Sequence, residues 1–240
     1  MSLINGAKFL LQRALRHYGW EIHRFVQAET SQLCAQLERR KIAAVLDVGA
    51  NEGQFASALL SAGYTGKVIS FEPLSDPYKK LTKLAERHPH WQVAPRGAVG
   101  AQDGSIEINV SQNVVSSSIL GILSDHTSAA PASKFVGKET VPISTLDKYL
   151  TFNPLVAPFI KIDTQGYEME VLKGAPTLLS QASGVQVELS IAPLYDGQPD
   201  LMEMFAFMKQ AGFTIWSINP GFRDPETSRL LQVDALFFRG

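Results

Sequence analysis

Short apolar runs alternate with amphipathic stretches from residue 42 to the carboxyl end of the chain. A short, mostly apolar run is typical of a strand buried on both faces, and apolar residues three or four positions apart are typical of a helix that covers such a sheet. Strands are predicted at 43–48, 67–72, 91–94, 159–163, 185–189, 214–218 and 233–238. Helices are predicted at 53–62, 76–87, 168–173, 176–181 and 199–211.

Three parts of the chain depart from this alternation. Residues 104–120 alternate apolar and polar positions with a period of two, which predicts an inserted hairpin. Residues 121–137 are rich in Ser, Ala and Gly and are expected to form a long loop, a kind of segment that often acts as a lid. No helical pattern separates the last two strands, and 221–225 read Gly-Phe-Arg-Asp-Pro, so these strands are expected to pair antiparallel at the end of the sheet.

Together these elements predict an α/β fold. We expect a doubly wound, Rossmann-like sheet of seven strands, mostly parallel, with an antiparallel last strand. A length of 240 residues fits one full-sized domain with a modest extension. The expected organisation is a helical extension at residues 1–41 followed by the α/β domain at 42–240.

The extension and the domain carry opposite charge. The formal net charge of the chain is −1, but seven Lys and Arg side chains against three Glu give residues 1–41 a charge of +4, which leaves −5 for the remainder. Arg13 and Arg16 interrupt the apolar residues of the extension, so no stretch reaches the roughly 20 apolar residues of a membrane span. We expect amphipathic helices packed on the domain, and peripheral contact with an anionic membrane or a partner is the alternative.

Composition also bears on compartment and partners. The single cysteine, Cys34, rules out an internal disulfide and a Cys-rich zinc site, and it fits a reducing, cytoplasmic location. The near-neutral total charge lacks the basic surface that non-specific nucleic-acid binding requires. The composition therefore predicts a soluble protein that does not bind nucleic acid.

The most informative segment is 45–55, Val-Leu-Asp-Val-Gly-Ala-Asn-Glu-Gly-Gln-Phe, where a predicted strand runs through a glycine-containing turn into a helix. Such a turn lets a nucleotide approach the backbone. A dinucleotide fingerprint has Gly at its first, third and sixth positions, but these positions hold Gly49, Asn51 and Gln54, and no Gly-Lys-Ser/Thr phosphate loop is present. A nicotinamide-dependent oxidoreductase is therefore the less favoured alternative.

Acidic residues near this turn favour a cationic cofactor. Asp47 precedes the first glycine by two positions, and the second predicted strand ends at Glu72, where a carboxylate can accept both ribose hydroxyls. S-adenosylmethionine carries a sulfonium and an ammonium and no phosphate, so it suits a carboxylate here. We therefore expect S-adenosylmethionine as cofactor and adenosylhomocysteine as product. The expected contacts in this region are Asp47, Gly49, Ala50, Asn51, Gly53 and Glu72.

With these motifs the chain resembles the FkbM-type methyltransferases of the class I adenosylmethionine-dependent fold. The resemblance covers about residues 42–240. Its segments are 45–53, 70–73 (Ser-Phe-Glu-Pro), 116–118 (Ser-Ser-Ser), 145–147 (Thr-Leu-Asp), 160–168 (Ile-Lys-Ile-Asp-Thr-Gln-Gly-Tyr-Glu), 171–175 (Val-Leu-Lys-Gly-Ala), 187–190, 193–195 and 231–234. The resemblance implies a seven-stranded sheet with an antiparallel last strand and O-methylation of hydroxyls on sugars, glycolipids or polyketide-like products. Some members carry Glu at the position of Gln165, so an acidic role is not transferred to it.

The acceptor side of the site is expected at the end of the fourth strand. If strands 43–48 and 159–163 lie on either side of the reversal in strand order, Asp163 ends next to the turn. Alternation places Lys161 and Asp163 on one face, and the neighbouring strand brings Glu188 close. We expect Asp163 first and Glu188 second as the general base, with Lys161 as orienter. The alternatives are a purely structural ion pair of Lys161 with either carboxylate, and a Mg²⁺ ion held by the two carboxylates.

Further residues are assigned less directly. By topology and resemblance, Gly97 and Ala98 after the third strand and Pro73 after Glu72 are expected to contact the cofactor, and Ser117 with its neighbours to contact cofactor or acceptor. His126 is expected on the surface. Tyr195, Trp216 and Phe222 are candidates to stack on a sugar, with burial in the core as the alternative. A small-molecule or glycan acceptor is predicted, and a non-catalytic adapter with the same fold is the competing hypothesis.

Overall fold

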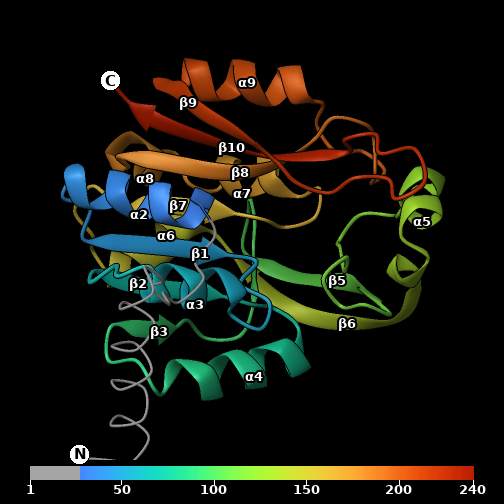
Figure 1. Cartoon of the computed structure of the whole chain (residues 1–240). Coiled ribbons are helices and arrows are strands. Elements are labelled where there is room, and N and C mark those ends of the chain that lie inside the picture. Colours follow the sequence, from blue (N-terminus) through green and yellow to red (C-terminus); the bar gives the residue numbers. More distant parts are fainter. Residues whose placement is uncertain (1–27) are drawn as a thin grey trace, which may run out of the picture.

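The larger of two sheets contains seven strands in the spatial order β3-β2-β1-β7-β8-β10-β9 (Figure 1). The computed structural model describes residues 28–240. The strands of this sheet are β1 (Ala44–Val48), β2 (Lys67–Phe71), β3 (Trp91–Val93), β7 (Phe159–Ile162), β8 (Gly184–Ser190), β9 (Phe213–Pro220) and β10 (Gln232–Arg239). Neighbours from β3 to β8 are parallel, and β10 is antiparallel to both β8 and β9. The predicted doubly wound sheet with an antiparallel last strand is confirmed.

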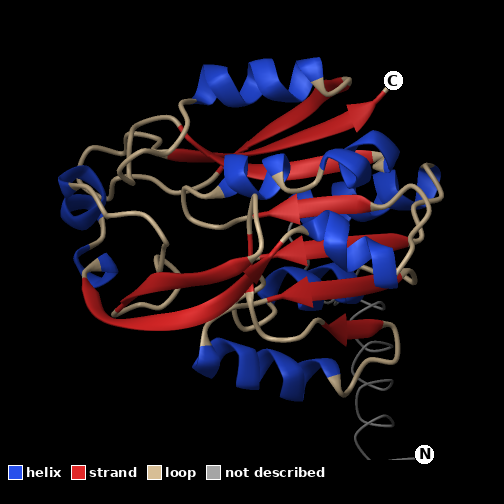
Figure 2. Ribbon diagram, turned by 180° about the vertical axis from the view of Figure 1, so that it is seen from behind, coloured by secondary structure: helices blue, strands red, loops and turns tan. Residues whose placement is uncertain are grey.

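Helices cover both faces of this sheet (Figure 2). They are α2 (Ala28–Arg39), α3 (Gln54–Ser61), α4 (Ser75–Ala85), α6 (Leu146–Phe152), α7 (Glu168–Lys173), α8 (Pro176–Gln181) and α9 (Leu201–Gln210). Helix α5 (Ser124–Ala129), which is followed by a 3₁₀ turn at Pro131–Ser133, lies apart from this sheet (Figure 1). Local sequence explains several starts: Asp200 and Glu203 form a capping box at α9, Thr145 accepts from the Lys148 N–H at α6, and Pro176 opens α8.

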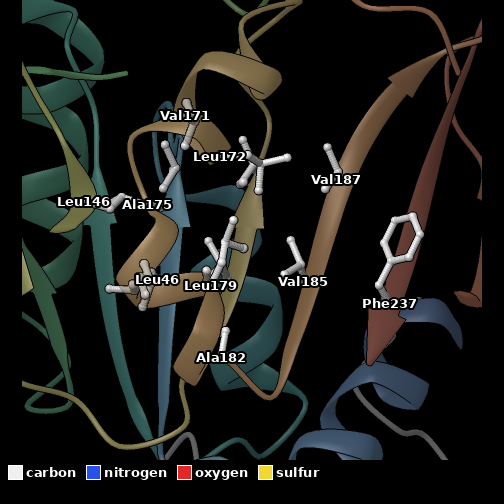
Figure 3. Close-up of a cluster of buried hydrophobic side chains, with 14 of the residues drawn as sticks. Leu46, Leu146, Val171, Leu172, Ala175, Leu179, Ala182, Val185, Val187 and Phe237 are labelled. Atoms are coloured by element: carbon white, nitrogen blue, oxygen red, sulfur yellow. The ribbon is translucent and has the colours of Figure 1, made fainter. Parts of the chain in front are cut away.

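Alternate residues of each central strand enter different cores. Leu46 of β1 packs with residues of α6, α7, α8 and α9 on one face, as the close-up of Figure 3 shows for part of that cluster. Its neighbour Val45 packs with residues of α2, α3 and α4 on the other face. Because successive strand residues point to opposite faces, a sheet buried on both sides needs the continuous apolar runs seen in the sequence.

A smaller sheet projects beyond the carboxyl ends of the parallel strands (Figure 1). It consists of β4 (Ala98–Val99), β5 (Gly104–Ser111) and β6 (Phe135–Ser144) in the order β4-β6-β5. The predicted hairpin within 104–120 is wrong: β5 pairs with β6 over its length, and the later part of the range contributes only an isolated bridge between Asn109 and Ser118. Gly137 and Pro142 obscure the strand pattern of β6 in the sequence, because both residues are uncommon within strands.

The other predicted elements vary in accuracy. The seven predicted strands and five predicted helices occur with their ends shifted by at most two residues. The long loop expected at 121–137 is wrong, because α5, the 3₁₀ turn and the start of β6 lie within it. Helix α6 was not predicted from the sequence. The helices α7 and α8 are as short, but Gly174 after α7 and Pro176 at the start of α8 mark their boundaries.

The amino-terminal extension is described only from residue 28. There α2 buries Leu33, Cys34 and Leu37 against the core that contains Val45. Cys34 is a free, buried thiol, and a cytoplasmic location stays a prediction. None of the helices between residues 28 and 240 combines the length and the apolar content that a membrane crossing needs. The expectation for 1–27, including membrane contact, lies outside the described residues, and the boundary at residue 41 stays a prediction.

Replacing Gly174 by Ala tests the contact between the end of α7 and the smaller sheet. A Cβ at Gly174 would overlap the carbonyl oxygen of Gly100, which follows β4. We expect the free energy of unfolding to fall by about 1–3 kcal/mol, the usual cost of overpacking, measured by urea denaturation. Gly137→Ala is the matched control, because nothing lies within 4 Å of its added Cβ and the strand conformation accepts Ala. Equal stabilities of the two variants would contradict the predicted clash.

Candidate active site

The strand order reverses between β1 and β7, and a cleft opens at the carboxyl ends of the strands beside this point. In an open α/β sheet, ligands bind in the crevice at such a reversal. The cleft has a volume of about 1440 Å³ and takes its walls from the turns after β1, β2 and β7, from α2 and α3, from the segment 113–119, and from one face of β8, β9 and β10. It is large enough for a cofactor and a second ligand together.

The turn after β1 is held by left-handed residues and by its own hydrogen bonds. Gly49, Asn51 and Gly53 have φ values of 78°, 49° and 94°. The N–H groups of Gly49 and Ala50 both donate to the Phe71 carbonyl, and those of Asn51 and Gly53 donate to Glu72 Oε2 and to the Ala50 carbonyl. These groups are therefore not free to cradle a pyrophosphate, which a dinucleotide site of this kind requires.

Glu72, directly after β2, presents a buried carboxylate to the cleft. One oxygen accepts from the Asn51 N–H and the other from the Leu74 N–H, both at 2.8 Å. Each carboxylate oxygen can accept more than one hydrogen bond, so Glu72 retains acceptor capacity toward a ligand. Burial raises the pKa of Glu72 to about 7, despite these two hydrogen bonds.

Lys161 of β7 is the central charge of the site. Its side chain is buried, at 6% relative exposure, with Nζ 3.1 Å from Asp163 Oδ2 and 3.7 Å from Asp47 Oδ1. Burial works against the charged form, but the two carboxylates outweigh it and hold the pKa of Lys161 above its usual range. The Lys161–Asp163 pair is one of the two pairings expected from the sequence; the contact with Asp47 was not anticipated.

An amide network joins Asp163 to Glu188. Gln165 Nε2 donates to Asp163 Oδ1 at 2.8 Å and to Glu188 Oε2 at 2.7 Å, and its Oε1 accepts from the Tyr195 hydroxyl at 2.7 Å. Gln232 Nε2 adds a second donor to Glu188 Oε2. The pKa of Asp163 is lowered, because Lys161 and Gln165 overcome its burial, whereas burial and the charge of Asp163 raise the pKa of Glu188. These shifts favour the charged form of Asp163 and the neutral form of Glu188.

Most predicted site residues line the cleft, but two do not. Lining residues among those predicted are Gly49, Ala50, Asn51, Glu72, Pro73, Gly97, Ala98, Ser117, Lys161, Asp163 and Glu188. Asp47 is fully buried beneath the cleft, where it accepts from the Ser70 hydroxyl and faces Lys161. Gly53 faces Trp91, whose ring an added Cβ would meet. Their contact with a ligand stays a prediction; in the structure Asp47 faces Lys161, and Gly53 permits the left-handed start of α3.

The remaining candidates also differ from expectation. Ser118 donates to the Gln165 carbonyl at 2.6 Å, so it supports the turn after β7. His126 is not on the surface but buried, at 3% relative exposure, against Tyr195 and Phe222. Trp216 is 51% exposed and so is not a core residue. The hydrogen-bond network of Gln165, Tyr195 and Gln232 was not predicted from the sequence. Its contacts depend on the register of β8 and β10 and on the turn after β7.

The chemistry of the cleft fits a cationic cofactor without phosphate. Glu72, Asp163 and Glu188 line it, Lys161 is already paired, and the turn has few free N–H groups. These features suit the ammonium, sulfonium and ribose of S-adenosylmethionine better than a pyrophosphate. Within residues 28–240, no group of three or more His, Cys, Asp or Glu side chains is placed to hold a metal ion.

The strand order, the reversal beside β1 and the antiparallel β10 define a class I methyltransferase α/β fold. Comparison with known proteins places the chain more narrowly: residues 47–215 match the Methyltransferase FkbM domain, and the chain belongs to this family. It is 27% identical over 144 residues to the hexuronic acid methyltransferase AglP of Haloferax volcanii, a match that covers 60% of this chain and 54% of AglP. The chain thus spans about half the length of this curated relative.

Solved structures agree on the fold. The crystal structure of Sp1610 from Streptococcus pneumoniae, in complex with S-adenosyl-L-methionine, superposes with a TM-score of 0.50 at 12% identity and covers 90% of this chain and 74% of that chain. A Listeria monocytogenes protein of unassigned activity gives the same TM-score at 9% identity, with 90% and 69% coverage. At these identities the likeness shows the fold alone.

Glu168, at the start of α7, holds the turn that carries Gln165. Its Oε1 accepts from the N–H groups of Thr164 and Gly166, at 2.8 and 3.1 Å, and from the Thr164 hydroxyl. Gln165 and Gly166 have φ values of 56° and 96°, so the turn is unfavourable without such support. Burial raises the pKa of Glu168 to about 7 from an ordinary value of 4.5.

Glu168→Gln tests this burial through the pH dependence of stability. Because the folded-state pKa is raised, the stabilising contribution of the protonated group is present below about pH 4.5 and is lost as pH rises through 7. The Gln variant keeps an acceptor oxygen and cannot ionise. We expect it to gain stability relative to the unchanged protein by about 2 kcal/mol between pH 5 and pH 8, measured by urea denaturation at both values. Parallel pH curves for the two proteins would show that Glu168 is not buried as a neutral acid.

Proposed function

We propose that this protein is an S-adenosylmethionine-dependent O-methyltransferase that acts on a hydroxyl of a saccharide, glycolipid or secondary metabolite. The observation that carries the proposal is the cleft at the strand reversal, which combines Glu72 on one side with Asp163, Lys161 and Glu188 on the other. Membership of the FkbM family and the name of the relative AglP support methyl transfer to a sugar.

On the cofactor side, Glu72 binds the ribose hydroxyls, and Gly49, Ala50 and Asn51 shape the floor. Pro73, Gly97 and Ala98 face the adenine base of the cofactor, and Ser117, in the segment 113–119, closes the site. Asp163 offers its carboxylate to the ammonium group. Asp47 is a positioning residue, because its charge reaches the site through Lys161. Bound S-adenosylmethionine would supply a methyl group attached to a sulfonium. The neutral thioether that remains is a good leaving group.

On the acceptor side, the protein must align a hydroxyl and accept its proton. Alignment alone can supply roughly 7–11 kcal/mol of such a barrier. Asp163 is ionised and each of its oxygens has one protein donor, Lys161 or Gln165, which leaves lone pairs for the proton of the acceptor. Lys161 and Gln165 fix the orientation of this carboxylate. Burial and the charge of Asp163 raise the pKa of Glu188, which orients the acceptor and is the second candidate for the base.

Binding of adenosylhomocysteine tests the cofactor assignment. We expect the full chain to bind it in isothermal titration calorimetry, and Glu72→Gln to weaken binding by about tenfold, because a charge-assisted hydrogen bond to ribose contributes about 1.5–3 kcal/mol. Glu52→Gln is a matched control, since Glu52 faces solvent and pairs with Lys80 outside the cleft. Absence of binding by the unchanged protein would refute the proposed function, and binding of NADH instead would favour an oxidoreductase.

Asp163→Asn tests the general base. The substitution preserves size but removes the proton acceptor, so we expect turnover to fall by at least ~10²-fold. The readout is transfer of labelled methyl groups to an acceptor under saturating cofactor. Circular dichroism and adenosylhomocysteine affinity monitor the fold and the cofactor site. A near-normal rate would move the role of base to Glu188 or Lys161, and activity lost with EDTA and restored by Mg²⁺ would favour the metal-assisted route.

A further inference from the structure

One half of the cleft is a polar face on β8, β10 and β9. Glu188, Asp234 and Asn219 lie opposite one another in a single row across the three strands, because the antiparallel register aligns them. All three line the cleft. Farther along β10 the same face becomes apolar, with Leu236 and Phe238 packed in the core under α2. Strand alternation thus leaves an uncovered row of acceptors and an amide beside Asp163.

His126 lines the same cleft. It lies on α5, with its ring centroid 5.1 Å from that of Tyr195 and 5.6 Å from that of Phe222. Neither of its ring nitrogens has a hydrogen-bond partner in residues 28–240. Nδ1 is enclosed, so a ligand in the cleft can reach the ring only through Nε2. A hydroxyl group bound at Nε2 would give this buried ring a hydrogen-bond partner. Burial lowers the pKa of His126, which keeps the ring neutral.

The charged acid of this half is Asp163. Glu188 and Asp234 also face it, but burial raises the pKa of both carboxyl groups and so favours their neutral forms. Lys161 is the only Lys or Arg among the described residues that line the cleft, and it is already shared between Asp47 and Asp163. No free cation in this part of the chain is therefore available to pair with a carboxylate on an acceptor, and burying an unpaired carboxylate beside the charged Asp163 would be strongly unfavourable.

We propose that the acceptor is a neutral, polyhydroxylated molecule, a hexoside rather than a hexuronide, whose hydroxyls bind the Glu188–Asp234–Asn219 row and a ring nitrogen of His126. Carboxylates and amides accept and donate to adjacent hydroxyls, which suits a sugar. The inference rests on the proposed methyltransferase function and differs in substrate class from the hexuronic acid named for AglP.

Matched acceptors that differ in one group test the inference. Methyl glucoside and methyl galactoside are compared with their uronides, in which a carboxylate replaces the primary alcohol, by transfer of labelled methyl groups and by saturation-transfer NMR with the full chain and adenosylhomocysteine. We expect at least tenfold preference for the neutral sugars. Calorimetry with adenosylhomocysteine on the same samples distinguishes failure of the proposed function from failure of the acceptor assignment. If the protein does not bind the cofactor, both fail. Cofactor binding together with preference for uronides, or with no contact to either class, overturns the inference alone.

Variants of His126 identify its contribution. His126→Phe preserves ring packing against Tyr195 and Phe222 but removes both nitrogens, so we expect KM for the neutral sugar to rise about fivefold, which corresponds to one lost hydrogen bond. His126→Asn and His126→Gln each restore a polar atom near one ring nitrogen, and one of them should recover most of the affinity. The dissociation constant of adenosylhomocysteine should stay constant in all three. A KM unchanged in His126→Phe, or a loss that neither polar variant reverses, contradicts a direct hydrogen bond to the acceptor.

Discussion

The burial of Lys161 between Asp47 and Asp163 is the constraint on which the rest of the site depends. An ammonium group in a central strand is tolerated only when carboxylates compensate for its lost hydration. Asp47 lies in β1 and Asp163 directly follows β7, and these two strands are the pair at the reversal in strand order. The buried ion pairs of Lys161 therefore lie at the point where the strand order of the sheet reverses.

This arrangement separates two carboxylates that sequence alone treats as equivalent. Asp163 takes the direct interaction with Lys161 and an amide donor from Gln165, so it remains ionised. Glu188 receives two amide donors but is buried and faces the charge of Asp163, so its pKa is raised. Neighbouring groups with pKa values driven apart can act as acceptor and donor in one reaction. The interactions that compensate for burial of these groups therefore also shift the pKa values of Asp163 and Glu188 in opposite directions.

The general architecture could be predicted from the sequence because it depends on local patterns. Continuous apolar runs specify buried strands, and the segment from Asp47 to Gly53 marks the cofactor turn. Features that depend on long-range register could not be predicted in this way. The partner of β5 lies beyond α5, in a strand disguised by Gly137 and Pro142, and the burial of His126 depends on Tyr195 and Phe222, which are far away in sequence. Asp47 was predicted to contact a ligand because the sequence shows its position beside the turn. Its pairing with Lys161 depends on the register between β1 and β7, which the sequence does not show.

The packing of Gly49 has a mechanical consequence. Its Cα approaches the Asp163 carbonyl so closely that any side chain would overlap it, and the Asp163 N–H donates to the Val48 carbonyl at 3.0 Å. The turn proposed to hold the cofactor and the turn that carries Asp163 are therefore in backbone contact, without an intervening side chain to absorb a displacement. A displacement of one turn would pass directly to the other, so the distance between the two turns is set by the main chain itself.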